Sequence, residues 1–325
     1  MATTFYNQIS SNKRQSIVLA IVVAAILGLL GFAIGYALTG TASGGVGATL
    51  IAIAIAGISS LGSYFAGDKL VLATSQAREV DEQAAPQLIN VVRELTLAAG
   101  VPMPHVYVME DTAPNAFATG RDPAHASLAV TTGLLEKMDR EELQGVIGHE
   151  LSHVRNYDIR FTLLVGVLVG SVALLSDFFL RWGFWFGGGR SRDDRDRGGG
   201  GLGAIFFIVA IILAILAPIA SQLVQLAVSR QREYLADASS VEITRNPHGL
   251  ERALEKIATD KEVLEVASRA TQHLYFTNPI KKFEARSAGL FSTHPPIVDR
   301  VNLLRDLSGE PPLDPTDTAA LAGLD

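Results

Sequence analysis

The chain of 325 residues contains no cysteine, and this absence limits the kinds of site that it can carry. Disulfide bonds, cysteine-held iron–sulfur clusters and thiolate zinc sites are all excluded, and a reducing compartment would suit the chain. Any zinc site must therefore use histidine and carboxylate ligands. The formal net charge of −6 gives no sign of a nucleic-acid partner.

Charged residues are largely missing from four long apolar runs, and the mean hydropathy of +0.28 is high for a soluble protein. We expect the first two runs, 16–38 and 46–65, to form a transmembrane hairpin within residues 16–66, because roughly 20 apolar residues span a bilayer. A cleaved signal peptide is the weaker alternative, since signal cores are only roughly 7–15 residues long. The small residues of the second run would let two spanning helices pack closely.

The third and fourth runs predict a second hydrophobic hairpin within residues 159–228. Between them lies the linker 183–203, whose glycines and mixed charges predict disorder. Lysine and arginine residues around the first hairpin place the catalytic side in the cytoplasm, although the arginines of the linker would then lie outside. An alternative is that these two runs dip into the membrane without crossing it.

The remaining segments predict a globular domain in two parts, residues 67–158 and 229–307. A cytoplasmic segment, 1–15, precedes the first hairpin, and a disordered tail, 308–325, follows the domain. Strands are expected in "HVYVME", "NAFATG" and "SLAVTTG". Helices are expected from Pro86 to Gly100, from a capping box at Asp139 and Glu142 through His153, and in "SRQREYLADASSVEIT" and "HGLERALEKIATD".

The sequence "HELSH" places His149 and His153 four residues apart, on one face of a helix, where both can bind one zinc ion. Glu150 lies about 100° around the helix from His149 and can act as general base toward a zinc-activated water. A catalytic zinc also needs a third protein ligand. The extended motif H-E-x-x-H-x-x-G-x-x-H is excluded, because Asn156 and Ile159 stand where it requires glycine and histidine.

A glutamate on a second helix is the other common third ligand, and Glu233 in "SRQREYLADAS" is the best candidate. Periodicity alone leaves Glu242 and Glu251 possible, and a solvated helix face is the plain alternative for Glu233. Asp237 lies one turn beyond Glu233. It could fix the tautomer of a ligand histidine or could form an ordinary salt bridge.

The chain resembles the HtpX-type membrane zinc metalloproteases, which are distantly related to the CaaX prenyl proteases. The resemblance covers nearly the whole chain and is carried, in order, by the paired N-terminal runs, "PNAFATGR", "AVTTGLLEKMDREELQGVIGHELSHVRNYD", "SRQREYLADA" and "FSTHPP". It implies an α+β fold class: a mostly helical, zincin-type (gluzincin-like) metalloprotease domain with a small β-sheet, plus four membrane helices in two hairpins. It also implies one Zn²⁺ per chain on His149, His153 and Glu233, with Glu150 as base and Asp237 in support.

By the same resemblance, the chain is a multi-pass endopeptidase of the bacterial cytoplasmic membrane, with its protease domain facing the cytoplasm. Its partners would be the lipid bilayer and misfolded or damaged membrane proteins, in protein quality control and stress response. Alternatives are a CaaX-type prenyl-protein protease and a catalytically silent membrane scaffold or transporter. Glu150 argues against a silent site, and four runs look too few to enclose a prenyl chamber. The apolar runs hold no interior ionisable residue before Asp177, which argues against a transporter.

Further residues are candidates for binding the substrate. Asn115, Ala116, Phe117 and Ala118 could present an edge strand to an extended peptide, which suits a broad substrate range. His294 and Arg232 are candidate donors to the oxyanion of the transition state. An alternative role for His294, which precedes two prolines, is to shape a turn.

Overall fold

The computed structural model describes residues 39–164, 230–260, 262 and 295–322, with isolated positions among residues 10–36. The chain divides into two compact units. The first unit contains residues 66–163 and the described residues from 230 onwards, and the second contains the described residues between 14 and 65. The expected linker 183–203 and most of the expected hairpin 159–228 lie outside the described residues.

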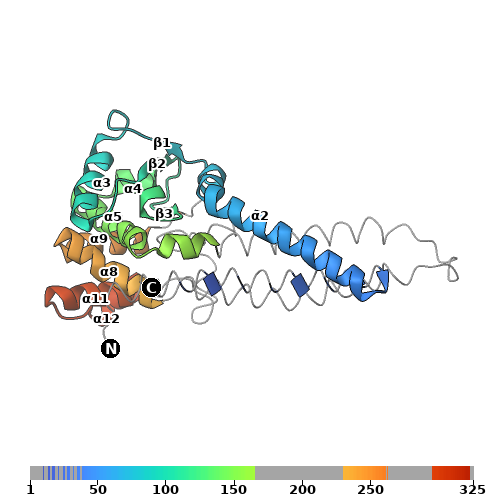
Figure 1. Cartoon of the computed structure of the whole chain (residues 1–325). Helices are drawn as coiled ribbons and strands as arrows, with labels where there is room; N and C mark the ends of the chain where they lie inside the picture. Colours follow the sequence, from blue (N-terminus) through green and yellow to red (C-terminus); the bar gives the residue numbers. More distant parts are fainter. Residues whose placement is uncertain are drawn as a thin grey trace, which may run out of the picture. The chain divides into compact units, whose positions relative to one another are not determined.

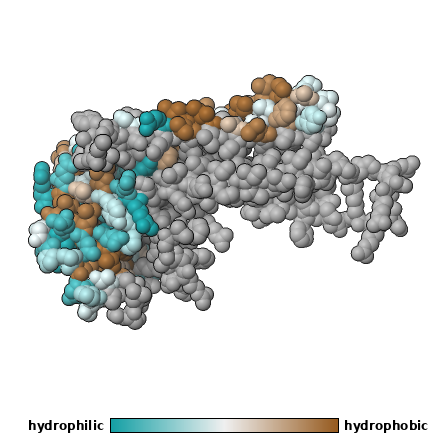
Figure 2. All heavy atoms as spheres, turned by 90° about the horizontal axis from the view of Figure 1, so that it is seen from below, coloured by the Kyte–Doolittle hydropathy of each residue, from teal (hydrophilic) through white to brown (hydrophobic). Residues whose placement is uncertain are grey.

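The second apolar run is helical, as predicted, and lies within α2 (Ala42–Thr74). Large apolar side chains are exposed along this helix, and they form the brown band over α2 in Figure 2. They are Val46, Leu50, Ile51, Ile53, Ile58, Leu61, Phe65 and Leu70. Within the part of the chain that the structure describes, no helix is both long and apolar enough to cross a membrane.

Small residues bring α2 close to the first apolar run. A side chain at Gly35 would overlap the backbone of Gly44 and the Cβ of Ala48, so the approach depends on glycine. The hydroxyl of Thr49 donates a hydrogen bond to the carbonyl oxygen of Gly28 at 3.2 Å. This is the close packing that the small residues of the second run predict.

The first unit contains a small β-sheet beside its helices (Figure 1). The sheet has four strands in the order β1-β2-β4-β3. Strands β2 and β4 are parallel, whereas β1 pairs with β2 and β3 pairs with β4 in antiparallel fashion. Strand β3 is therefore an edge strand. The bounds are β1 (Arg78–Glu79), β2 (His105–Met109), β3 (Ala116–Gly120) and β4 (Ala126–Thr131). The three longer strands occupy the three segments predicted to be extended, except that the end of "SLAVTTG" begins a helix.

The helices of the first unit pack around α5, which contacts α3, α8, α9 and strand β3. Asp139 and Glu142 form the predicted capping box: the carboxylate of each accepts a hydrogen bond from the backbone N–H of the other, at 2.9 and 2.8 Å. The helices are α3 (Pro86–Ala99), α4 (Thr132–Lys137), α5 (Arg140–Arg155), α8 (Arg230–Thr244), α9 (Pro247–Thr259), α11 (Ile297–Ser308) and α12 (Pro315–Ala322), with a short 3₁₀ helix η1 (Pro123–His125).

The core of the first unit surrounds α5 on several sides. Leu143, Ile147 and Leu151 of this helix are at most 1% exposed, and they belong to one core cluster with residues of α3, α9 and α11. A side chain at Gly145 would lie 2.5 Å from the backbone nitrogen of Leu250, so α5 and α9 approach at a distance that only glycine permits. The polar residues His149, Glu150 and Ser152, which follow Gly145 on α5, are buried as well.

The tail 308–325 was expected to be disordered, and for residues 308–322 this expectation is wrong. Helix α11 extends through Ser308, and α12 follows it. A carboxylate oxygen of Asp314 accepts hydrogen bonds from the backbone N–H groups of Thr316 and Asp317, both at 2.8 Å, which caps the start of α12. Leu313 and Leu321 pack against the core. Two apolar side chains and a cap thus order a segment whose composition is otherwise typical of a tail.

Candidate metal centre

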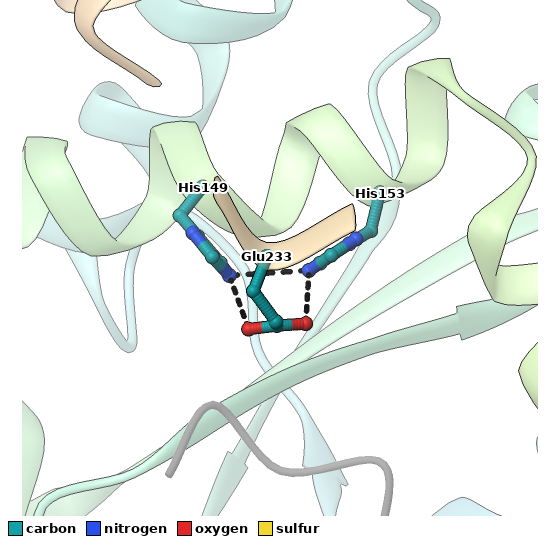
Figure 3. Close-up of side chains that lie close together, drawn as sticks. All are labelled: His149, His153 and Glu233. Carbon is teal, nitrogen blue, oxygen red and sulfur yellow. Dashed lines mark hydrogen bonds and ion pairs between the residues drawn. The ribbon is translucent and has the colours of Figure 1, made fainter. Parts of the chain in front are cut away.

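Three predicted ligands lie together between α5 and α8 (Figure 3). The Nε2 atoms of His149 and His153 are 3.1 Å apart. Each of these atoms is 3.6 Å from one carboxylate oxygen of Glu233. The side chains of His149, His153 and Glu233 are only 1, 16 and 6% exposed. The structure therefore brings two imidazoles and a carboxylate to one buried point.

The far side of each imidazole contacts a carboxylate. Nδ1 of His149 lies 2.8 Å from Oδ1 of Asp237, and Nδ1 of His153 lies 3.0 Å from Oδ2 of Asp158. Because an ionised carboxylate only accepts hydrogen bonds, Nδ1 must carry a hydrogen in both rings. In this tautomer the lone pair of Nε2 is the one that a ring can offer to a metal ion. The predicted supporting position of Asp237 agrees with this geometry, whereas Asp158 is not among the residues predicted from the sequence.

Asp158 reaches His153 because α5 breaks just before it. The helix ends at Arg155, and Tyr157 then adopts φ = 60°, a left-handed conformation that is uncommon for residues other than glycine. This turn brings Asp158 back to a histidine five residues earlier. Helical spacing gives no sign of such a contact. An acidic residue directly after the expected end of the helix was the only available signal.

Each of these two carboxylates also contacts a buried arginine. Arg300 of α11 donates to both oxygens of Asp237, at 2.8 and 2.7 Å. Arg232 of α8 lies 3.8 Å from Asp158, and its guanidinium stacks over the ring of Phe161 at 4.5 Å. Arg232 was a predicted candidate for the oxyanion donor, and the structure places it against Asp158 and Phe161. Arg300 is not among the site residues predicted from the sequence.

The charges of the site fit a divalent cation. Among the described residues, four buried carboxyl groups (Glu150, Asp158, Glu233 and Asp237) accompany two buried guanidiniums, so acidic groups outnumber the arginines. Burial alone would lower the pKa of His153, but the hydrogen bond to Asp158 and the charges of Glu233 and Asp158 raise this pKa to about 9. The same surplus of negative charge attracts a cation, and two histidines with one carboxylate are a ligand set typical of catalytic zinc.

Glu150 lies beside this cluster on α5 and is 3% exposed. Its carboxylate accepts a hydrogen bond from the backbone N–H of Ala118 in β3. Burial and the charge of Glu233 raise the pKa of Glu150, although the two histidines and the Ala118 hydrogen bond oppose this shift. A carboxyl group with a raised pKa is suited to exchange protons near neutral pH.

The predicted substrate residues Asn115, Ala116, Phe117 and Ala118 are buried, with exposed fractions of 2, 0, 0 and 6%. Ala116, Phe117 and Ala118 lie on the edge strand β3, and Asn115 directly precedes it. Their role in substrate binding stays a prediction. His294 lies outside the described residues. The two alternative third ligands lie elsewhere: Glu242 contacts Arg155 at 3.7 Å, and Glu251 accepts from Arg305 at 3.0 Å.

Known proteins whose sequences are similar to this chain are named as proteases. Two relatives, both named "Protease HtpX homolog", are 46% identical in Streptococcus gordonii and 43% identical in Streptococcus uberis. Each comparison covers 93% of this chain and 99% of the relative. A solved structure, "Crystal Structure of S. mikatae Ste24p", has a TM-score of 0.46 and 15% identity over 91% of this chain and 66% of that chain, which is too low a likeness to bear on function.

The family model of Peptidase family M48 matches residues 82–308. This range includes all three clustered residues, Glu150, and the arginine and carboxylate pairs behind the histidines. Together with relatives above 40% identity over almost their full length, the match leaves no ambiguity about the family. The chain belongs to peptidase family M48 and is a metalloprotease.

Proposed function

We propose that this chain is a zinc endopeptidase with one Zn²⁺ held by His149, His153 and Glu233. The observation that carries the proposal is the orientation of the two imidazoles. Each has its Nδ1 hydrogen directed to a buried carboxylate and its Nε2 directed to Glu233. Such an arrangement selects the tautomer that binds metal.

Glu150 is the general base of the proposed reaction. Zinc, when bound, supplies a Lewis acid that polarises the scissile carbonyl group and makes water a stronger nucleophile at neutral pH. Glu150 takes a proton from the attacking water and later passes it to the leaving amine. The Ala118 N–H fixes the Glu150 carboxylate against β3. The chain thereby holds the base at the strand where we propose that the substrate lies.

The substrate is proposed to be an extended segment of a misfolded or damaged membrane protein. Strand β3 has β4 on one side and Glu150 on the other, so a peptide added along β3 would pass the base. Hydrogen bonds between strands read the backbone rather than the side chains, which suits a protease of broad specificity. Asn115, whose side chain accepts from the Ala116 N–H at 2.9 Å, shapes the start of this strand.

We also propose that the chain is a multi-pass protein of the bacterial cytoplasmic membrane. The exposed apolar side chains of α2 support this location. Because the chain has no cysteine, Ser191→Cys creates a single labelling site in the linker. If the two flanking runs cross fully, an impermeant thiol reagent will label this cysteine from outside the cell. Labelling from the cytoplasmic side alone would exclude full crossing.

Removing and restoring the metal tests the proposed activity. Purified full-length protein is expected to contain about one zinc per chain and to cleave an unfolded protein such as casein. A chelator should abolish cleavage, and added zinc should restore it. A folded protein that binds no zinc would contradict the proposed ligand set. Zinc binding without cleavage of any unfolded protein would contradict broad endopeptidase activity.

A further inference from the structure

One side chain of the C-terminal helix α11 reaches the outer layer of the metal centre. Arg300 is 1% exposed and donates from Nε to Oδ2 of Asp237 at 2.8 Å and from Nη2 to Oδ1 at 2.7 Å. A side-on pairing of this kind uses both oxygens and fixes the plane of the carboxylate as well as its position. Oδ1, which accepts the hydrogen of His149 Nδ1, is thereby held in place.

Two groups compete for Nδ1 of His149. Asp237 Oδ1 lies 2.8 Å away and accepts a hydrogen, so it selects the tautomer in which Nε2 is a ligand. Arg300 Nη2 lies 3.3 Å away and can only donate, so it would select the opposite tautomer, with the hydrogen on Nε2. The shorter contact with a charged acceptor decides in favour of Asp237. His149 therefore keeps its hydrogen on Nδ1 as long as the Asp237 carboxylate accepts the hydrogen bonds of Arg300.

We propose that Arg300 is a positioning residue that sets the metal affinity of His149 from α11, by holding Asp237 in the orientation that selects the metal-binding tautomer. The proposal rests on the proposed function, because it takes His149 as a metal ligand. Arg300 acts on the far side of the imidazole, through Asp237. The segment that begins at Ile297 is therefore a functional part of the site as well as part of the core.

A comparison of two arginines on α11 tests this role. Arg305, five residues after Arg300, forms an ion pair with Glu251 at 3.0 Å instead of with Asp237, which makes Arg305→Met the matched control. Zinc dissociation constants are measured on full-length protein by competition with a chelator. Arg300→Met is expected to weaken zinc binding by about 10–100-fold, the usual effect of losing a partner behind a ligand. Arg305→Met should leave the constant unchanged.

A charge-retaining variant separates positioning from charge alone. Arg300→Lys keeps the positive charge, but its single ammonium group cannot span both carboxylate oxygens of Asp237. We expect zinc affinity between those of the wild type and Arg300→Met. This variant also supplies the measurement if Arg300→Met does not fold. Thermal unfolding of each variant after removal of the metal by a chelator measures the contribution of Arg300 to stability alone. The zinc dissociation constant measures its effect on metal binding.

A double-mutant cycle gives the sharpest readout. In Asp237→Asn, the Arg300 guanidinium loses its carboxylate and is free to donate to His149 Nδ1, which favours the tautomer that cannot bind metal. Adding Arg300→Met to Asp237→Asn should therefore leave zinc affinity unchanged or raise it, whereas the same substitution weakens binding in the wild-type background. Such a change of sign is a coupling that independent structural damage does not produce.

The possible results separate this inference from the proposed function. A folded wild type without zinc would overturn both. Tight zinc binding by the wild type, Arg305→Met, Arg300→Met and Arg300→Lys would leave the proposed function intact and overturn the positioning role. Equal losses of affinity from Arg300→Met in both backgrounds would also overturn it, because the effect would then not pass through Asp237.

Discussion

Glu150→Gln is expected to lower kcat/KM for protein cleavage by about 10²–10⁴-fold, the range over which general acid–base groups contribute. Glutamine has nearly the shape of glutamate and can still accept the hydrogen bond of the Ala118 N–H, but it cannot take a proton from water. Zinc should stay bound at about one per chain, because Glu150 is not among the three clustered ligands. Loss of activity with retained zinc is thus the expected combination.

Glu141→Gln is the control for this substitution. Glu141 lies on the same helix, and its side chain is 58% exposed and accepts a hydrogen bond from Arg252 at 2.8 Å. The variant makes the same chemical change away from the metal centre and should keep wild-type activity. Substantial cleavage by Glu150→Gln would show that another group serves as base. Loss of zinc from Glu150→Gln would show that the substitution disturbs the ligands, and the loss of activity would then say nothing about a base.

The sequence predicts the inner part of the site because helical geometry relates its residues. His149, Glu150 and His153 lie on one turn of a helix whose start is marked by a capping box. Asp237 follows Glu233 by one turn of α8, so its place beside a ligand histidine follows from the same geometry. The relative positions of residues within one helix follow from their spacing in the sequence. The structure places these side chains where the spacing predicts.

The outer part of the site depends on contacts that spacing does not encode. Asp158 reaches His153 through a left-handed residue, and Arg300 arrives from a helix more than 140 residues later in the chain. Helix α11 was itself not predicted, although the buried residues Arg300, Val301 and Leu304 recur at helical intervals before Gly309. An arginine within such an apolar stripe was the signal for a buried acidic partner, because buried charges are generally paired.

The choice of third ligand was the least certain step from sequence, since Glu233, Glu242 and Glu251 all lie on predicted helices. The structure distinguishes them by their contacts: the side chain of Glu233 lies 3.6 Å from the histidine Nε2 atoms, whereas that of Glu242 on the same helix is 44% exposed and contacts Arg155. Glu251 contacts His248 and Arg305. Only Glu233 lies against both Nε2 atoms.

Glu233→Gln is therefore expected to weaken zinc binding by more than the roughly 10–100-fold that follows from losing a partner behind a ligand. The substitution keeps the size of the side chain but replaces an anionic oxygen ligand with a neutral amide, and it removes one negative charge from the site. Glu242→Gln makes the same change on the same helix and should bind zinc as the wild type does. Zinc content after dialysis and competition with a chelator would measure both effects. If Glu242→Gln lost zinc while Glu233→Gln kept it, the ligand assignment would be wrong. If both variants kept tight binding, neither glutamate would be a required ligand and the assignment of Glu233 would be wrong.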